Sequence, residues 1–276
     1  MHTIIKAVKR KYESSELKTP EFYVGFNDVV SNDFNTLFRS LPSDRSDKVF
    51  AVPGDFHGRL LPPSSVHFAY SSWALQWLTE VPKAAEGLKS PAWSGEEREE
   101  VYDAYLSQFE RDMESFLKCR DVEMVEGGIM ALLIPGVPAL WDPQKESLLF
   151  RGLNFSDLPL STWSKRLSES MSRTFNLPYY FPTTEEPRAI LQKSNSFIVE
   201  RMEILNSGAS LNVDGHVACL RAVHQNMLTH MFGAETINET FDLLLKKFQA
   251  SSIYADPSSD RTVMIVAILK HKHKNI

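Results

Sequence analysis

The chain has 276 residues, a formal net charge of −5 and 43% hydrophobic residues, a composition typical of a globular protein that buries a core. An acidic chain has no general attraction to nucleic acid or to an anionic membrane surface, and no apolar run approaches the ~20 residues of a membrane span. Two cysteines, Cys119 and Cys219, cannot build a disulfide framework. Together with a start that does not resemble a signal peptide, they predict a cytoplasmic protein.

The first part of the chain alternates between helix and strand patterns. Residues 1–15 predict an amphipathic helix, because Ile4, Ile5, Val8 and Tyr12 fall on one face. Short strands are predicted over residues 21–26, 48–52 and 66–70, each bounded by turn-forming residues.

A long helix is predicted over residues 96–118, followed by a buried strand. The helix presents one apolar face, made of Val101, Tyr105, Phe109, Met113 and Phe116. Residues 126–128 read as a turn into residues 129–134, which are apolar at every position and therefore predict a strand covered on both faces. Strands alternating with helices predict a doubly wound α/β fold.

The second half is predicted to begin with a helical cap over residues 136–173, which are rich in Leu, Ser and Pro. A helix capped by Thr183 or Thr184 should run to residue 193, and a strand should span 196–205. Helices over 213–232 and 236–250 follow, the second with Thr236 and Glu239 at capping-box spacing, and then a final strand over 263–269. We expect three segments: an α/β core (1–135), a cap (136–195) and a C-terminal part (196–276).

Common catalytic motifs are absent from the sequence. It contains no serine-hydrolase elbow, no glycine-rich nucleotide loop and no paired histidines at zinc spacing. His216, His224 and His230 share one predicted helix but are not separated by four residues, so surface or core positions are favoured over metal ligation.

Four segments carry a resemblance to a known family. They are NDFNTLFRSLP at 32–42, the stretch 49–82, QFERDMESFL at 108–117 and FNLPYYFP at 175–182. Together they resemble the plant SABATH methyltransferases, which transfer a methyl group from S-adenosylmethionine to small acids. The resemblance implies a Rossmann-like class I methyltransferase sheet with a mainly helical cap. The first strand of that sheet should precede Thr3, so the resemblance implies that it is missing from this chain.

The resemblance also implies a cofactor site. Asp28 matches the acid that binds the ribose hydroxyls, and Val29 matches the apolar residue beside the adenine. Asp55 and Phe56 match a Ser-Phe pair that contacts the adenine, and Ser72 matches a further cofactor contact. A carboxylate can accept hydrogen bonds from both ribose hydroxyls. From the residues alone, Asn27 and Asp28 could equally close a turn.

The substrate contacts implied by the resemblance are Trp73, Gln76 and Trp77, which would hold a small carboxylic acid. Without the resemblance, both tryptophans would be assigned to the core. No catalytic residue is predicted, because a carboxylic acid with a pKa near ~4 is already ionised at neutral pH and needs no base. The family also implies a homodimer.

A magnesium site is implied at Phe175 and Asn176, but Ser94 and Arg173 replace oxygen-bearing residues of the family pattern. Because Arg offers only donors and a positive charge, we expect weak or no metal binding. Two hypotheses therefore remain open: an active carboxyl methyltransferase, and a truncated, inactive homologue that acts as a dimerisation partner.

Overall fold

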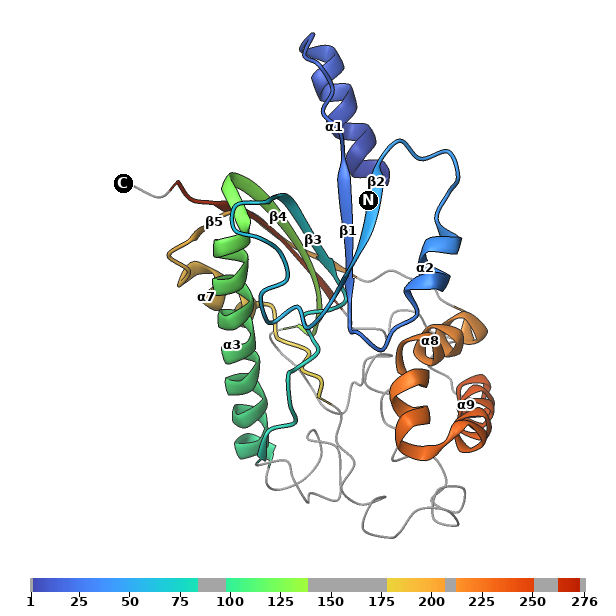
Figure 1. The fold of residues 1–276 in the computed structure, drawn as a ribbon. Helices are drawn as coiled ribbons and strands as arrows, with labels where there is room; N and C mark the ends of the chain where they lie inside the picture. The colour runs from blue at the N-terminus through green and yellow to red at the C-terminus, as the bar shows by residue number, and fades with distance from the viewer. Residues whose placement is uncertain (1, 84–97, 139–177, 207–211, 251–262, 274–276) are drawn as a thin grey trace.

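The computed structural model describes residues 2–83, 98–138, 178–206, 212–250 and 263–273. Their strands form a two-stranded sheet and a four-stranded sheet (Figure 1). The small sheet pairs β1 with β2 in parallel, over Tyr23–Asp28 and Lys48–Pro53. The larger sheet has the order β3-β4-β6-β5, over Val66–Ser72, Met124–Gly136, Val263–His271 and Phe197–Asn206. Within the described residues, no strand pairing joins β1 to β3.

The larger sheet is mixed in direction. β3 pairs with β4 in parallel, whereas β6 runs antiparallel to both β4 and β5. β4 is an inner strand, and its Met130, Leu132 and Ile134 are fully buried. This agrees with the uninterrupted apolar sequence, because an inner strand covered on both faces has little room for polar side chains. The predicted α/β fold is confirmed.

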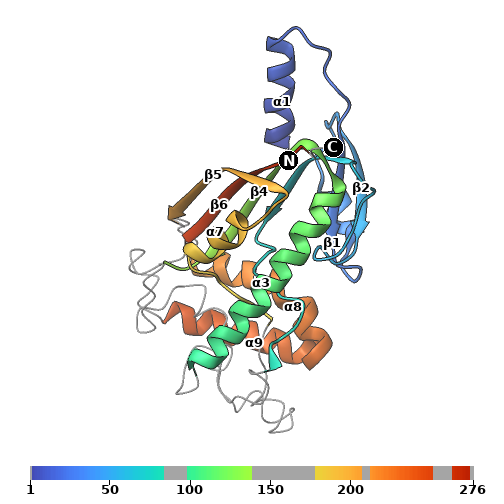
Figure 2. The ribbon, with the colours of Figure 1, turned by 90° about the vertical axis from the view of Figure 1, so that its left-hand side faces the viewer.

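One face of the larger sheet is covered by α3 (Arg98–Glu123) and α7 (Glu185–Gln192), as the two views show (Figures 1 and 2). The five residues predicted for the apolar face of this long helix are all buried in the main core. The helix extends five residues beyond its predicted end at residue 118. Its last turn carries Arg120 and Glu123, whose polar contacts an apolar pattern cannot reveal.

The predicted turn at residues 126–128 is wrong. α3 ends at Glu123 and β4 begins at the next residue, so the two glycines lie inside the strand. Gly127 has φ +72°, and the register of β4 against β3 shifts between Val66 and Phe68. The glycines therefore form an irregularity in the ladder, a role for which a residue without Cβ is suited.

Two short N-terminal helices accompany the small sheet. α1 (His2–Ser14) projects away from both sheets in Figure 1 and buries Ile5 as predicted. α2 (Phe34–Ser40) is capped by Asp33, whose carboxylate accepts hydrogen bonds from two main-chain N–H groups of the first turn. This cap fixes where the chain turns after β1.

The C-terminal helices α8 (Val213–Phe232) and α9 (Ala234–Gln249) pack against each other around a separate core. Gly233 joins them with φ +84°, so α9 begins two residues before Thr236 and the predicted capping box is wrong. Thr184 also makes no side-chain cap; Glu186 instead accepts a hydrogen bond from the N–H of Thr183.

Nearly all of the predicted cap over 136–173 lies outside the described residues. None of the helices in the described ranges is long and apolar enough to cross a membrane.

Candidate active site

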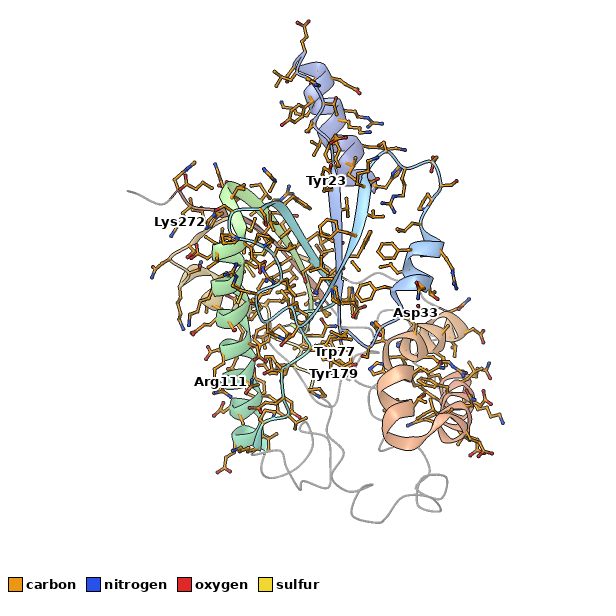
Figure 3. All side chains as sticks on the ribbon, in the orientation of Figure 1. Tyr23, Asp33, Trp77, Arg111, Tyr179 and Lys272 are labelled. Carbon is orange, nitrogen blue, oxygen red and sulfur yellow. The ribbon has the colours of Figure 1, made fainter. Side chains whose placement is uncertain are left out.

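The candidate site lies at the carboxyl ends of β1 and β2 in the small sheet and of β3 in the larger sheet. β1 starts at Tyr23, near the upper end in Figure 3, and runs toward the end where Trp77 and Tyr179 are labelled side by side. The register of the small sheet places Asp28 opposite Pro53. In α/β sheets, ligands bind at this carboxyl edge because the connecting loops there can vary without disturbing the sheet.

Asp28 is the last residue of β1, which ends two residues beyond the predicted end of that strand at residue 26. Its Oδ1 accepts a hydrogen bond from the N–H of Val29 at 2.8 Å, and its carbonyl accepts one from the N–H of Gly54 at 2.9 Å. Asn27 reinforces this junction by donating to the carbonyls of Val52 and Gly54. The other carboxylate oxygen, Oδ2, has no partner among the described residues, which leaves one acceptor for a ligand.

The turn after β2 carries Asp55 and Phe56. Asp55 Oδ1 lies 2.9 Å from the main-chain nitrogen of His57 and 2.8 Å from its ring Nδ1. The side chain of Asp55 is 62% exposed, and its Oδ2 has no partner in the described part of the chain. The ring centroids of Phe56 and His57 are 4.1 Å apart, and the ring of Phe56 also packs edge-on against Phe116 of α3. These two contacts fix the position of the Phe56 ring.

The end of β3 exposes a tryptophan in a rarely used conformation. Ser72 is half-buried, and Trp73 follows with φ +55° and 42% of its surface exposed. The N–H of Trp73 donates to the carbonyl of Leu133, which holds this bend against β4. An exposed aromatic side chain at a positive φ is unusual and is commonly associated with a binding site.

Gln76 is 4% exposed and has one unsatisfied atom. Its Nε2 donates to the carbonyl of Trp73 at 2.9 Å, whereas its Oε1 is buried without a hydrogen-bond partner in the described residues. A buried acceptor without a partner costs about 1–3 kcal/mol. A hydroxyl or N–H group of a ligand would remove that cost.

Trp77 and Tyr179 form an aromatic wall next to Gln76. Their rings are 4.1 Å apart, and the two residues pair through an isolated bridge. The N–H of Tyr180 donates to the carbonyl of Gln76, which ties the same two segments together. Figure 3 shows Trp77 and Tyr179 adjacent to each other although about a hundred residues separate them in sequence.

His224 of α8 completes the wall from the C-terminal helices. Its Nδ1 donates to the carbonyl of Leu220 at 2.7 Å, so the neutral ring accepts the Tyr179 hydroxyl at Nε2. Burial lowers the pKa of His224 and raises that of Tyr179, so both are neutral at neutral pH. Sequence reasoning assigned His224 no role at the site, because only the fold brings α8 to Tyr179.

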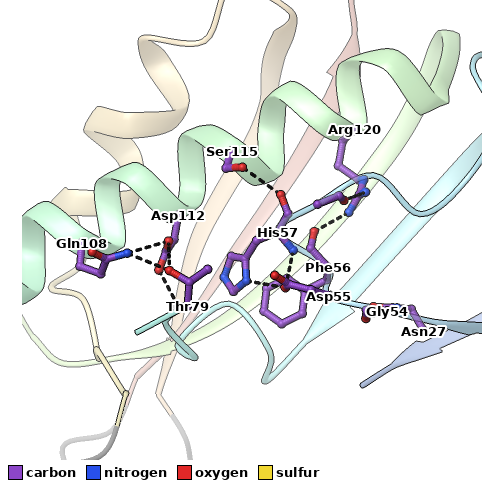
Figure 4. A network of polar contacts seen from close by, with 11 residues as sticks. Asn27, Gly54, Asp55, Phe56, His57, Thr79, Gln108, Asp112, Ser115 and Arg120 are labelled. Carbon is purple, nitrogen blue, oxygen red and sulfur yellow. Dashed lines mark hydrogen bonds and ion pairs between the residues drawn. The ribbon is translucent and has the colours of Figure 1, made fainter. Parts of the chain in front are cut away.

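Asp112 of α3 secures the segment that follows Trp77. Its two oxygens accept hydrogen bonds from the N–H and the hydroxyl of Thr79, and Gln108 donates to the same cluster (Figure 4). This buried network holds the end of the Trp77 loop against the helix and is structural.

The predicted metal residues, Phe175 and Asn176, lie outside the described residues, as do Ser94 and Arg173. Within the described ranges, no cluster of three or more His, Cys, Asp or Glu side chains could hold a metal ion.

The fold matches that of a known methyltransferase. The solved structure of a loganic acid methyltransferase with SAH (S-adenosylhomocysteine) superimposes with a TM-score of 0.88 at 33% identity. The match covers 99% of this chain and 80% of that chain. The fold therefore defines an α/β methyltransferase, with the candidate site at the carboxyl edge of its strands.

The sequence comparisons identify the family. Residues 1–272 match the model of the SAM dependent carboxyl methyltransferases. Loganic acid O-methyltransferase of Catharanthus roseus is 36% identical over 99% of this chain and 76% of its own length. Benzoic acid/salicylic acid carboxyl methyltransferase 3 of Petunia hybrida is 33% identical over 89% of this chain and 73% of its own. The chain belongs to the SAM-dependent carboxyl methyltransferase family, so the predicted SABATH resemblance is confirmed.

Proposed function

We propose that this chain transfers a methyl group from S-adenosylmethionine to the carboxylate of a small plant acid at the site described above. One observation carries the proposal. In a member of this family, Asp28 and Asp55 lie at and just after the ends of two adjacent strands, and each has a carboxylate oxygen with no partner in the described residues. The aromatic segment after β3 contains Gln76, whose Oε1 is buried without a hydrogen-bond partner in the same described ranges.

The residues at the ends of β1 and β2 fit the cofactor. Asp28 would accept from the ribose hydroxyls, and Asp55 from the adenine amine, since each has an oxygen without a partner in the described residues. Val29 and Phe56 would pack on the adenine, and Ser72 would close the side toward β3. When bound, the cofactor supplies a methyl group on a positively charged sulfur.

The segment after β3 would hold the acid. Trp73 and Trp77 offer flat apolar surfaces, and Gln76 Oε1 favours an acid that carries a hydrogen-bond donor. The protein has to orient the carboxylate and exclude water, because the carboxylate is already ionised at neutral pH. The products are a methyl ester and S-adenosylhomocysteine, and no proton has to move.

The resemblance supports three further proposals. The protein would act in the cytoplasm as a homodimer, with the segments 1–135, 136–195 and 196–276 as core, cap and C-terminal part. Magnesium binding at Phe175 and Asn176 would be weak or absent, because Arg173 and Ser94 depart from the family pattern.

The proposal is tested by calorimetric titration of the purified chain with SAH. We expect saturable one-to-one binding, weakened about 100-fold or more in Asp28→Ala, because Oδ2 of Asp28 can accept from both ribose hydroxyls and both charge-assisted hydrogen bonds are lost. Asp44→Ala removes an exposed carboxylate elsewhere and should bind as the wild type does. No binding by folded wild-type protein would refute the proposal, and equal binding by Asp28→Ala would refute the assigned site.

A further inference from the structure

We propose that Arg120 and Glu123, in the last turn of α3, are positioning residues for the cofactor. They hold the turn that carries Asp55 and Phe56 in one conformation. The inference rests on the proposed function, which assigns Asp55 and Phe56 to the adenine. It extends the cofactor site to the last turn of α3, where no site residue was predicted.

Arg120 binds the main chain of this turn directly. Its Nη1 donates to the carbonyl of Phe56 at 2.9 Å, and its Nη2 donates to the carbonyl of Gly58 at 2.8 Å (Figure 4). A guanidinium can make both bonds at once because its donors are spread over a rigid plane. The same group lies over the ring of Phe116, 5.2 Å from its centroid, which further restricts its position.

Glu123 binds the next part of the same segment. Its Oε1 accepts hydrogen bonds from the N–H groups of Leu60 and Leu61, at 2.6 and 3.1 Å. The same oxygen accepts from Arg120 Nη2 at 2.9 Å, and Oε2 lies 2.9 Å from Arg120 Nε. Arg120 and Glu123 are only 6% and 1% exposed, so each charge depends on the other and on the turn for its partners.

The hydrogen bonds leave the turn little freedom. Ser115 donates to the carbonyl of His57 at 3.0 Å, and the carbonyl of Asp55 accepts from the N–H of Gly58. Four consecutive carbonyls, from residue 55 to residue 58, are therefore engaged, three of them by α3. The side chain of Asp55 is left exposed with one oxygen unpartnered among the described residues.

These contacts differ from ordinary core packing. They reach main-chain atoms of Phe56 and of the residues that follow it, up to Leu61, whereas α3 is already anchored by its apolar face. A helix that fixes a binding turn before the ligand arrives lowers the entropy lost on binding. The expected consequence of loosening the turn is weaker cofactor binding, beyond any loss of stability.

The experiment compares SAH affinity and thermal unfolding in Arg120→Lys, Glu123→Gln and Ser115→Ala. Arg120→Lys keeps the charge but cannot make both carbonyl bonds, and Glu123→Gln keeps the size of the side chain. The control is Lys118→Gln, which alters an exposed pair with Glu114 on the same helix. Titrations are made well below each unfolding temperature, so that only folded protein is measured.

We expect SAH to bind about tenfold more weakly to Arg120→Lys and to Glu123→Gln, because each variant loses about one charged hydrogen bond. Lys118→Gln should bind SAH with the affinity of the wild type. Ser115→Ala leaves no buried charge unpaired and should weaken binding with little effect on unfolding. Variants that unfold earlier but bind SAH with wild-type affinity would overturn the inference and leave the proposed function intact. If the wild type does not bind SAH, the proposed function fails first.

Discussion

At both Asp28 and Asp55, only one of the two carboxylate oxygens has a partner in the described residues. In each, Oδ1 accepts main-chain N–H groups of the local turn, and Oδ2 has no partner in the described residues. The sequence alone allowed Asp28 either to close a turn or to bind a ribose. The geometry shows that the turn contact uses only one oxygen, so it does not exclude the second role.

We expect His224 to make the stability of the protein depend on pH. Burial lowers its pKa below the ordinary 6.5, so the unfolded chain binds more protons than the folded chain once the pH falls below that value. Stability should therefore decrease as the pH falls from about 7 toward 5, by at most about 1.4 kcal/mol per pH unit for this proton.

The matched variant is His224→Gln, whose Oε1 can still accept the Tyr179 hydroxyl but cannot be protonated in this range. Unfolding by urea, followed from pH 7.5 to 5.0, should show a smaller loss of stability in the variant than in the wild type. Parallel pH curves for the two proteins would show that His224 is not the source of the dependence.

At the scale of elements, α3 serves both the core and the site. Its apolar face packs on the sheet, and its polar residues from Gln108 to Glu123 hold the loops that follow β2 and β3. The helical spacing of apolar residues predicted the first role. The second involves residues that a helical pattern would assign to the solvent-exposed face.

The end of β4 is packed so closely that it requires a glycine. A Cβ at Gly136 would lie 2.5 Å from the carbonyl oxygen of Pro182 and 2.9 Å from the side chain of Ile265. Gly136→Ala should therefore lower the free energy of unfolding by about 1–3 kcal/mol. Gly58→Ala meets only an ordinary contact of 3.5 Å and serves as the control in the same urea titration. Equal stability of Gly136→Ala and the wild type would contradict this packing.

At the scale of the whole molecule, the described residues form two hydrophobic cores. The main core lies between the larger sheet and the helices α3 and α7, and the second lies between α8 and α9. Among the described residues, the bond between Tyr179 and His224 joins the two parts beside Trp77. The aromatic wall is therefore built from residues of both parts.

Phe241 tests whether the two cores unfold separately. Its side chain is fully buried between α8 and α9, and Phe241→Ala should cost about 3–5 kcal/mol within that core. In thermal melts followed by circular dichroism, we expect a first loss of helix signal at a lower temperature, with the main transition near its wild-type position. The exposed Glu239→Ala is the control. A single transition that shifts as a whole would show that the cores unfold together.

The sequence was most informative where local periodicity matches burial. The predicted helix at the N-terminus, the apolar face of α3 and the buried strands β4 and β6 were all confirmed, because side-chain spacing reports directly on which face is covered. Helix ends were less predictable. α7 begins directly after Thr184, as predicted, although the threonine side chain makes no cap, whereas the conformation of Gly233 makes α9 begin before Thr236.

The sequence by itself determined the α/β class, the family and the segments that carry the candidate site, because these depend on residue types and spacing. Only the tertiary structure decided which distant residues meet there. Arg120 and Glu123 meet the turn at Phe56, and His224 meets Tyr179, across 45 or more residues. Such contacts depend on how helices pack against the sheet, which no local pattern encodes.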